Sequence, residues 1–496
     1  MAARHLVDRR TALLGSAAGL LGLAGVSGCG VSGSPVGATS GAVRTAEAAR
    51  RRAGQRVVSA TLTARPATLD LGGRVVQTWA YGDTLPGPVL RARAGDLLRV
   101  RVDNALPVET SVHWHGIALR NDMDGVPGMT QDPIAGGARF LHEFTVPDPG
   151  TYFYHPHTGV QLDRGLYGAL VVEDPAEAGG YDEEWVLVLD DWVDGTGRTP
   201  DGVLDGLRAG SAERGHPGMG HGSMGMGGGM MTATLGGAGD VDYPYYLANG
   251  RLPSAPDVLT ARPGQRLRIR LVNAGADTAF RVALAGHSLT VTHSDGFAVR
   301  PQDTDALLVG MGERYDIAVT LGDGVFPFVA VAEGKSGSAR SLVRTSGGSV
   351  PPESLRPGEL DGRLLSGTDL VADEGVRLTR RSVDRSHDLV LAGSMAPYRW
   401  TINGDTFEDA APLAVRAGER VRLRLRNASM MFHPVHVHGH TFALATGGAR
   451  KDTVVVRPMD AVDVELDATN PGQWAAHCHN VYHAESGMMT TLSYRT

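Results

Sequence analysis

Residues 88–104 read PVLRARAGDLLRVRVDN, residues 257–273 read DVLTARPGQRLRIRLVN, and residues 411–427 read APLAVRAGERVRLRLRN. Aligned on their central glycine, the three segments share an arginine two residues before it, arginines four and six residues after it, and an asparagine nine residues after it. Beyond the glycine, apolar residues alternate with arginine, which is the period-two pattern of a strand with one buried face. The chain therefore contains the same strand-forming module three times.

The spacing of the modules indicates three consecutive domains. Their central glycines, Gly95, Gly264 and Gly418, are 169 and 154 residues apart, and each interval has the length of one β-domain. Pro and Gly turn signals separate short strands, and no long amphipathic helix is visible, which favours β-sandwiches or barrels. We therefore expect an all-β protein with domain 1 at residues 55–178, domain 2 at 179–350, a linker at 351–380 and domain 3 at 381–496.

The composition excludes several classes of protein. The chain has 496 residues, with 47 Lys and Arg against 54 Asp and Glu, and this net charge of −7 lacks the basic footprint of a nucleic-acid-binding protein. Its 2 cysteines are too few for a disulfide scaffold or for a zinc site built from four thiolates. The 18 histidines and 15 methionines raise the question of a metal site, which a count of residues does not answer.

The N-terminus has the pattern of an export signal. Arg9 and Arg10 precede an apolar, glycine-rich stretch from Thr11 to Gly28, and a charged start followed by a short apolar run of small residues fits a secretory signal better than a membrane span. The arginine pair resembles a twin-arginine signal, which exports folded and often cofactor-loaded proteins. The tetrapeptide VSGC at 26–29 resembles a bacterial lipobox, which would place a lipid on Cys29; ordinary cleavage is the alternative.

These features predict where the mature protein resides. We expect residues 1–29 to be the signal and residues 30–54, rich in Gly, Ser, Ala and Thr, to be a flexible tether. The mature protein would lie at the outer face of the cytoplasmic membrane, or in the periplasm or extracellular space. A lipid on Cys29 would be its only attachment to a membrane.

Histidine pairs occur at matched offsets in domains 1 and 3. Nine residues after the repeat asparagine, domain 1 has HWH at 113–115 and domain 3 has HVH at 436–438. Five residues after a Pro-Gly pair, domain 1 has HPH at 155–157 and domain 3 has HCH at 477–479. Residues i and i+2 of a strand point to the same side, so the four pairs direct eight imidazoles toward one region. Imidazole binds copper, zinc, iron or nickel, and eight of them imply a cluster of several ions between domains 1 and 3.

A second ligand set surrounds the cysteine of the last pair. Cys478 lies between His477 and His479 but points to the opposite side of the strand, and His483 and Met488 follow it at intervals of five residues. With His433, these residues form the thiolate, two imidazoles and thioether of a blue-copper electron-transfer site. Because Cys478 is covalently adjacent to two histidines of the cluster, an electron that arrives at this site has a short bonded path inward. A lone histidine is usually structural, but ten at matched offsets are not explained that way.

The chain resembles the three-domain multicopper oxidases. The resemblance covers about residues 55–496 and rests on HWHG at 113–116, HPH at 155–157, HPVHVH at 433–438 and HCHNVYHAESGM at 477–488. It implies three cupredoxin-like Greek-key β-sandwich or barrel domains and four copper ions. In this family a reductant is oxidised one electron at a time at the type 1 copper, and dioxygen is reduced to water at a trinuclear cluster.

The resemblance also assigns the copper ligands. It implies a type 1 copper held by His433, Cys478, His483 and Met488, a type 2 copper held by His113 and His436, and a type 3 pair held by His115, His155, His157, His438, His477 and His479. A methionine at position 488, where some relatives have Leu or Phe, resembles the bacterial branch with a modest redox potential.

Two acidic residues are candidates for proton delivery. Asp124 matches a carboxylate that the family places near the type 2 copper and that is thought to deliver protons; the alternative is a loop aspartate in an Asp-Gly turn. Many bacterial relatives have another acid directly after the second type 1 histidine. Here that position is Ala484, and Glu485 follows it, so Glu485 is the candidate for the second proton relay.

A methionine-rich insertion in domain 2 suggests the reductant. Residues 216–231 read HPGMGHGSMGMGGGMM, too rich in glycine to build a core. Thioethers select Cu(I), and the segment resembles the Met-rich insertions of periplasmic cuprous oxidases. We therefore expect a cuprous oxidase, with Cu(I) contacts from Met219, Met224, Met226, Met230 and Met231. A disordered loop without function is the alternative for this segment.

Other functions remain open at this stage. A laccase-like oxidase of phenols and other small aromatics has the same fold and predicts an open apolar cleft beside His483. A copper-sequestering protein without turnover belongs to a different class, but storage needs neither four matched histidine pairs nor a cysteine between two cluster ligands. We expect dioxygen and either Cu(I) or a small aromatic reductant as partners, no nucleic acid, and a monomer.

Overall fold

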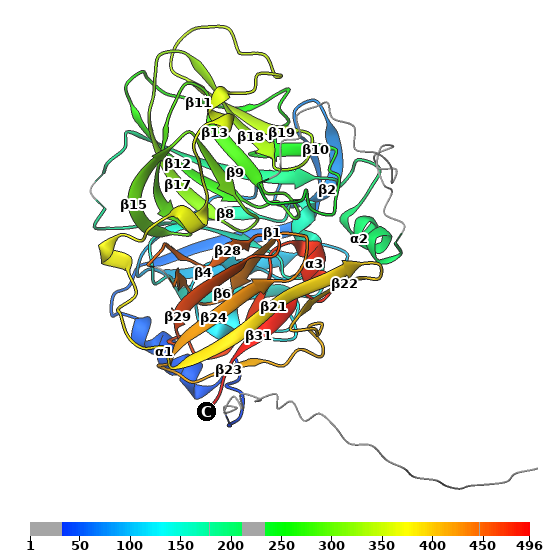
Figure 1. Ribbon diagram of the computed structural model, residues 1–496, viewed down its shortest axis with the longest axis vertical. Coiled ribbons are helices and arrows are strands. Elements are labelled where there is room, and N and C mark those ends of the chain that lie inside the picture. Colours follow the sequence, from blue (N-terminus) through cyan, green and yellow to red (C-terminus); the bar gives the residue numbers. More distant parts are fainter. Residues whose placement is uncertain (1–31, 178, 211–233, 446) are drawn as a thin grey trace, which may run out of the picture.

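The computed structural model describes residues 32–177, 179–210, 234–445 and 447–496. The expected signal and Cys29, as well as the methionine-rich insertion at 216–231, lie outside these residues. Strands make up 46% and helices 9% of the structure, which confirms the prediction of an all-β protein. The strands form six sheets that stack in three pairs, one pair in each expected domain (Figure 1).

Domain 1 is a sandwich of two four-stranded sheets. One has the order β2 (Val75–Tyr81), β1 (Val57–Asp70), β4 (Leu97–Asn104) and β6 (Arg139–Thr145), and the other the order β3 (Leu90–Arg93), β8 (Gly168–Glu173), β7 (Gly150–His155) and β5 (His113–His115). β1 pairs parallel with β4, and β3 with β8, so the chain crosses between the sheets as in a Greek key. Single 3-10 turns, η1 (Asn121–Met123) and η2 (Gln161–Arg164), lie in the connections.

Domain 2 pairs two six-stranded sheets. The first has the order β10 (Tyr245–Ala248), β9 (Glu183–Trp192), β12 (Arg266–Asn273), β17 (Arg314–Thr320), β14 (Leu289–Ser294) and β15 (Phe297–Thr304). The second has the order β11 (Asp257–Thr260), β19 (Ser338–Arg344), β18 (Val325–Ala332), β13 (Phe280–Leu284), β16 (Ala306–Val309) and β20 (Leu364–Leu365). Helix α2 (Pro200–Arg208) precedes the methionine-rich insertion.

Domain 3 repeats the architecture at the C-terminal end of the chain. One sheet has the order β22 (Tyr398–Ile402), β21 (Arg385–Met395), β24 (Arg420–Asn427), β29 (Ala461–Asp467), β26 (Phe442–Leu444) and β27 (Arg450–Lys451). The other has the order β23 (Leu413–Val415), β31 (Met489–Tyr494), β30 (Gln473–Cys478), β25 (His433–Val437) and β28 (Thr453–Val456). The short helix α3 (Val481–Glu485) follows β30.

The three repeated segments form equivalent strands, β4, β12 and β24. Each is entered through a glycine with positive φ, 90° at Gly95, 80° at Gly264 and 89° at Gly418, a conformation in which other side chains are strained. In β4 and β24 the apolar residues are buried, while the arginines four and six residues after the glycine are partly or fully exposed, as the alternation predicts. Each buried face packs into the core between the two sheets of its domain.

The asparagine that ends each module braces the loop that follows it. In all three domains its Nδ2 donates to two backbone carbonyls, one of them four or five residues onward, and its Oδ1 accepts from the N–H two residues onward. Asn104 thereby positions the loop that leads to His113, and Asn427 positions the loop that leads to His433. The match between the repeats therefore extends beyond the strand to the approach of the histidines.

Domain 2 departs from the half-buried pattern. All of β12 except its first residue is buried, including the arginines of the repeat. Arg268 Nε donates to Asp316 Oδ2 at 3.1 Å, and Arg270 NH1 donates to Thr151 Oγ1 in domain 1 at 3.0 Å. The arginine face of this strand is turned toward a neighbouring domain, a contact that the period of the sequence does not reveal.

The expectation of a flexible tether at residues 30–54 is wrong for the described part of that segment. Residues Gly41–Arg50 form helix α1, whose N-cap is Ser40, with the Ser40 side chain accepting from Val43 N. Val43 and Glu47 lie four residues apart, hence on one face of the helix, and both are buried. The small residues that suggested a tether include enough alanine to favour a helix once one face finds a partner.

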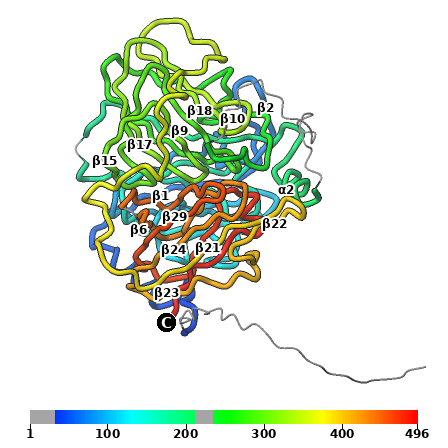
Figure 2. Tube along the Cα trace, viewed as in Figure 1, coloured from blue at the N-terminus to red at the C-terminus, as the bar shows by residue number. Residues whose placement is uncertain are grey.

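This N-terminal segment connects domains 1 and 3. Val36 N donates to Tyr494 O of domain 3 at 2.9 Å, whereas Glu47 Oε1 accepts from both Thr145 N and Thr145 Oγ1 of domain 1 at 3.0 Å. Figure 2 shows the C-terminus at the lower end of the molecule, where Thr496 N donates to Ser34 O. Residues 34–50 therefore fasten the interface between the two domains that carry the histidine pairs.

We predict that Glu47→Ala destabilises the protein. The substitution leaves the buried N–H and hydroxyl of Thr145 without this acceptor, which costs about 1–3 kcal/mol in the free energy of unfolding. The change is measured as a lower midpoint of thermal unfolding. Arg52→Ala, at an exposed position just beyond α1, is the control and should leave the midpoint unchanged. Equal midpoints for Glu47→Ala and the parent protein would contradict the fastening role of α1.

The linker at residues 351–380 packs against both neighbouring domains. It contains the 3-10 turns η3 (Gly358–Asp361), η4 (Gly367–Asp369) and η5 (Glu374–Val376), as well as β20, which pairs parallel with β16 of domain 2. Val371 forms a bridge with Gly448 of domain 3. The linker thus adds a strand to domain 2 and contacts domain 3.

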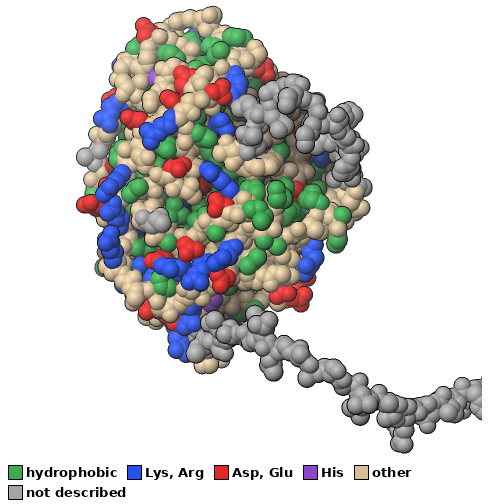
Figure 3. Space-filling model, viewed as in Figure 1, with side chains coloured by type: hydrophobic (Ala, Val, Ile, Leu, Met, Phe, Trp, Pro, Cys, Tyr) green, Lys and Arg blue, Asp and Glu red, His purple; other side chains and the backbone are tan. Residues whose placement is uncertain are grey.

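The described surface mixes charges of both signs. Figure 3 shows basic and acidic side chains close together over the sheet that contains β21, β24 and β29. Arg422 NH2, for example, lies 2.6 Å from Glu465 Oε1 across β24 and β29. Among the described residues no helix has both the length and the apolar character needed to cross a lipid bilayer.

Candidate metal centre

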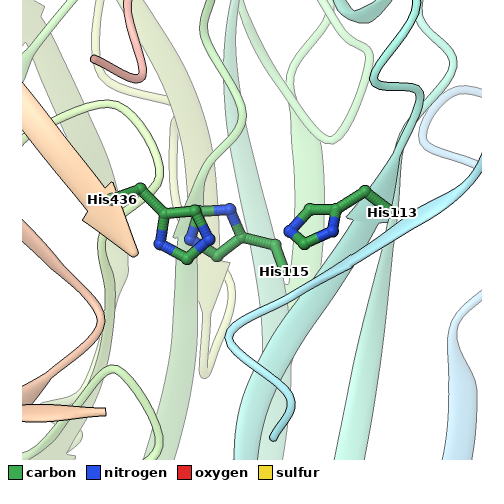
Figure 4. Close-up of side chains that lie close together, drawn as sticks. All are labelled: His113, His115 and His436. Atoms are coloured by element: carbon green, nitrogen blue, oxygen red, sulfur yellow. The ribbon is translucent and has the colours of Figure 1, made fainter. Parts of the chain in front are cut away.

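The histidine pairs lie on adjacent strands. In domain 1, β5 pairs antiparallel with β7 and places His113 opposite His155; in domain 3, β25 pairs with β30 and places His436 opposite His477. The two domains face each other at these strands. Figure 4 shows the ring of His436 beside that of His115, with His113 next to them, and the ring centroids of His115 and His436 are 3.7 Å apart.

All eight imidazoles converge in three groups whose ligand atoms lie within 4.8 Å of one another. Each group combines residues of domains 1 and 3: His113, His115 and His436; His115, His155 and His479; and His157, His438 and His477. The other described histidines, which the sequence left unassigned, belong to none of these groups: His142, His287, His293, His387 and His440. The structure therefore brings together the cluster residues that the sequence predicted.

Hydrogen bonds determine which nitrogen of each ring is available. The Nδ1 atoms of His113, His155 and His436 donate to the backbone carbonyls of Asp124, Pro156 and Asp452 at 2.8–2.9 Å. Because a carbonyl oxygen only accepts, each of these rings carries its proton on Nδ1 and a lone pair on Nε2. The three Nε2 atoms are buried and have no partner.

Two further lone pairs face each other. His477 Nδ1 donates to Cys478 O, and His438 Nδ1 donates to Asp124 Oδ2, so Nε2 of both rings is an acceptor. These two Nε2 atoms are 3.0 Å apart, and Nε2 of His157 lies 3.4 Å from that of His477. Acceptors cannot satisfy one another at this distance, whereas a cation bound between them would. The donor set therefore fits copper, for which neutral imidazole is a suitable ligand.

Burial keeps these imidazoles neutral. It lowers the pKa of six cluster histidines well below the ordinary value of 6.5, and the neighbouring imidazoles lower it further: His115, His155, His157, His438, His477 and His479. Burial also lowers the pKa of His436, although the nearby Asp452 opposes the shift. Neutral imidazole is the form that binds a metal ion.

The second ligand set lies on the opposite side of β30. Cys478 Sγ is 3.7 Å from His433 Nδ1 and 3.6 Å from His483 Nδ1, and the two nitrogens are 3.1 Å apart. Met488 is fully buried, and its backbone bonds to Cys478 and His483. The four residues predicted for a blue-copper site are thus brought together, and Cys478 is the free, buried thiol of the described chain.

The positions of domain 1 that correspond to the Cys478 ligand set hold residues that do not bind metal ions. Thr110 Oγ1 donates to Gln161 Oε1 at 2.7 Å, and Leu166 is fully buried. In domain 2, Val282 and Leu284 occupy the positions of the first histidine pair and are buried in the core. Neither arrangement offers a set of metal ligands.

Asp240 is a site residue that the sequence did not reveal. Its Oδ2 accepts from His483 Nε2 at 2.9 Å and from Tyr398 OH at 2.6 Å. Burial opposes protonation of His483, but the contacts with Asp240 and Cys478 prevail and raise the pKa of His483 to about 10. Asp240 thus orients the ring so that Nδ1 faces the thiolate. It lies 243 residues before His483, in domain 2, at a position that no motif marks.

Asp124 bridges the two halves of the cluster. It is fully buried, its Oδ2 accepts from His438 Nδ1 of domain 3 at 2.9 Å, and its Oδ1 lies 3.3 Å from His113 Nδ1 of domain 1. A residue of a simple surface turn would not be buried in this way. The geometry places a carboxylate in direct contact with two candidate ligands, as proton delivery requires.

Glu485 lies at an opening beside the cluster. It lines a small pocket whose wall also contains cluster histidines of both domains: His155, His157, His477 and His479. Burial raises the pKa of Glu485, which favours its protonated form. Ala484 lines the same pocket, so the shift of the acid by one residue still leaves a carboxyl group facing the cluster.

Comparisons with known proteins agree with this architecture. Models of the multicopper oxidase family match residues 63–177, 183–348 and 381–496. The chain is 50% identical to the multicopper oxidase MmcO of Mycobacterium tuberculosis over 91% of its length and 90% of that protein. It is 29% identical to copper resistance protein A of Escherichia coli over 86% of its length and 91% of that protein.

A solved structure shows the same fold. The crystal structure of a multi-copper oxidase from Pseudomonas thermotolerans matches with a TM-score of 0.66 and 26% identity, over 89% of this chain and 100% of that one. The prediction of cupredoxin-like domains is thereby confirmed. With eight converging imidazoles, a buried thiol between two of them and family matches in each domain, the chain belongs to the multicopper oxidases, a family of copper-binding oxidoreductases.

Proposed function

We propose that this multicopper oxidase is a cuprous oxidase in copper tolerance, which couples the oxidation of four Cu(I) to the reduction of one dioxygen and four protons to two waters. Four bound copper ions would supply the redox chemistry: one-electron oxidation at the Cys478 site and dioxygen reduction at the histidine cluster. The observation that carries the proposal is the position of the chain that leaves the methionine-rich insertion. On that chain, Asp240 Oδ2 accepts from Nε2 of His483, a candidate ligand of the Cys478 site, at 2.9 Å.

The path from the insertion to the site is short. The described chain resumes at Thr234, three residues after the insertion, and by Asp240 it contacts His483. Between them, Gly237 lies against the backbone of Met430 and the sulfur of Met431. The described chain that follows the insertion therefore lies beside the ligand set of Cys478, where Cu(I) would have to deliver its electron.

Thioethers also occur on the described surface near this path. Met430 is 71% exposed and Met459 69% exposed, unusual values for so apolar a side chain. Met459 follows Pro458, which packs against Gly236. In Figure 3 hydrophobic side chains gather over the region of β22 and α3, the helix that carries His483. Soft sulfur ligands select Cu(I), so this face supports the proposed substrate.

Residues of the chain would also provide the electron path and deliver the protons. Cys478 would hold the copper at which the electron enters, and its backbone connects to His477 and His479, which lie in the cluster. Asp124 Oδ2 holds the proton-bearing Nδ1 of His438 and is the group that would pass protons to the cluster. Glu485, whose pKa is raised by burial, would be the second proton donor, at the pocket lined by cluster histidines.

The methionine-rich insertion gives the first test of substrate. Deletion of residues 216–231 should lower kcat/KM for Cu(I) by at least about tenfold, equivalent to roughly 1.4 kcal/mol, and leave oxidation of an organic electron donor within about twofold. A variant in which the five methionines of the insertion are replaced by leucine keeps the length and removes the sulfur, and it should lose as much. Both activities are measured as oxygen uptake. Equal losses with Cu(I) and the organic donor would contradict the role of the insertion.

A laccase-like oxidation of small aromatics is the second candidate. It needs a reductant to reach the ring of His483, which is buried against Asp240 and the indole of Trp400, whose centroid lies 4.0 Å away. Oxygen uptake with Cu(I) and with a phenol, under matched conditions, separates the two candidates. A protein that only sequesters copper would bind Cu(I) without taking up oxygen.

The cellular setting is part of the proposal. We infer export through the twin-arginine-like signal at residues 1–29, retention at the outer face of the membrane by a lipid on Cys29, and a monomeric protein. Mass spectrometry of the mature chain tests the lipid directly, because an acylated Cys29 at the new N-terminus is heavier than a free one.

A further inference from the structure

A single buried carboxylate joins the histidine cluster to the domain that supplies none of its ligands. Asp452 of domain 3 is fully buried, and its Oδ1 accepts from His115 Nε2 of domain 1 at 3.1 Å and lies 3.4 Å from His436 Nδ1. Arg314 of domain 2 donates from its two terminal nitrogens to the two oxygens of Asp452 at 2.7 and 2.6 Å. All three domains therefore meet at one carboxylate.

Hydrogen bonds to three residues hold the guanidinium of Arg314 in place. It is fully buried, its Nε donates to Thr151 O of domain 1 at 3.1 Å, and its NH1 also donates to Gly312 O at 3.0 Å. The contact is tight enough that a side chain at Gly116 would collide with both Arg314 and Asp452. A guanidinium held at three of its edges fixes the plane of the carboxylate that it binds.

The hydrogen bond to Asp452 leaves Nδ1 of His115, and not Nε2, without a partner. His113, His155 and His436 leave Nε2 unpartnered, whereas His115 donates from Nε2 and leaves Nδ1 unpartnered. Thr453 Oγ1 lies at the same distance of 3.1 Å from His115 Nε2 and itself donates to Asp452 Oδ1 at 2.9 Å, so the carboxylate anchors both acceptors that turn Nδ1 of His115, rather than Nε2, toward the cluster. The carbonyl of Asp452 accepts from His436 Nδ1 at 2.9 Å, so Asp452 sets the proton position on both stacked rings.

We propose that Arg314 and Asp452 are positioning residues for the copper site: Asp452 sets the tautomers of His115 and His436, and Arg314 holds Asp452 in place. The proposal rests on the proposed function, because it assigns these residues to a copper-loaded cluster. Domain 2 then contributes to the cluster without providing a ligand. Groups in contact with metal ligands that set ring orientation typically change metal affinity or activity about 10- to 100-fold when replaced.

If Arg314 only stabilised the fold, replacing the arginine of another buried ion pair would have the same effects. Arg268 of domain 2 offers the matched control, because it is buried, pairs with Asp316 at 2.5 Å and belongs to none of the histidine groups. Arg268→Met and Arg314→Met each remove one buried guanidinium from the same domain. Both should lower thermal stability, but only the second should alter the copper site.

The experiment compares the copper-loaded full chain with Arg314→Met, Asp452→Asn, Arg314→Lys and Arg268→Met. Competition with a chelator should show about 10- to 100-fold weaker copper binding at the cluster for Arg314→Met and Asp452→Asn, with a smaller loss for Arg314→Lys. The electron paramagnetic resonance spectrum of the copper bound by His113 and His436 should change in the first two variants. The absorption band of the Cys478 site should be retained in all of them, and Arg268→Met should have the parent spectrum.

Two outcomes would overturn the inference. The first is a parent-like spectrum and copper affinity in both Arg314→Met and Asp452→Asn; the second is the same change in Arg268→Met. If a single variant does not fold because it leaves a buried charge unpaired, the neutral pair Arg314→Gln with Asp452→Asn is measured by the same two criteria. Parent protein that shows no blue band and no cluster signal would overturn the proposed function, and this inference with it.

Discussion

Cys478→Ser is expected to abolish the blue absorption band and reduce oxygen uptake, with Cu(I) or an organic donor, to the background of a reaction without enzyme. The thiolate lies 3.6–3.7 Å from two imidazole nitrogens and is bonded through the backbone to His477 and His479 of the cluster. A hydroxyl at this position is neither a good ligand for copper nor a conductor of its electron. Because Cys478 is bonded directly to His477 and His479, its sulfur begins a shorter bonded path to the cluster than His433 or His483 does, and its loss is expected to stop turnover.

The fold should survive this substitution. Serine is close to cysteine in size, and its hydroxyl would lie within reach of the nitrogens of His433 and His483, so the expected cost in free energy of unfolding is about 1 kcal/mol. Thermal unfolding of the copper-free proteins checks this point. A Cys478→Ser protein that is folded and still blue would disprove the assignment of the thiolate.

Asp124→Asn is expected to lower kcat about 10²- to 10⁴-fold and to leave the blue band intact. The amide keeps the size of the side chain, and the backbone carbonyl of residue 124 still accepts from His113 Nδ1. The variant therefore retains the approach of the ligands while losing the carboxylate that contacts His438. Steady-state oxygen uptake measures kcat, and absorption of the Cys478 site reports the undisturbed electron entry.

A neighbouring acid provides the control for Asp124. Asp122→Asn changes an aspartate two residues away that pairs with Arg120 at 2.6 Å and contacts no cluster histidine, so its kcat should equal that of the parent protein. An Asp124→Asn enzyme with parent kcat would show that protons reach the cluster by another route. Glu485, at the pocket beside the histidines, would then be the first residue to substitute.

Several local features of the chain were readable from sequence because they repeat. The period of two in each module predicted β4 and β24 with one buried face, and the offset from Asn104 and Asn427 located the histidine pairs. A His-x-His pair on a strand directs both rings to one side whatever surrounds it. The resemblance to the multicopper oxidases rested on the same motifs, and the family matches confirmed it.

Other features were invisible because they depend on contacts between domains. Helix α1 was misread as a tether, since its helical form relies on burial of Val43 and Glu47 against other parts of the chain. Arg268 and Arg270 of β12 follow the same pattern as the repeat arginines of β4 and β24, yet they are buried because domain 2 meets domain 1 at that face. The composition and the hydrophobic period of a segment do not show which other parts of the protein pack against it.

The sequence by itself determined which residues are the candidate metal ligands, because they occur at regular spacings within strands whose two-residue period is a local property of the backbone. Only the tertiary structure decided how those ligands are oriented. Asp240 contacts His483 across 243 residues, Arg314 contacts Asp452 across 138, and Asp452 contacts His115 across 337. No period relates residues so far apart in the chain. Their proximity arises from the packing of three domains around one cluster, which is why the partners of the ligands emerged from the fold and the ligands themselves from the sequence.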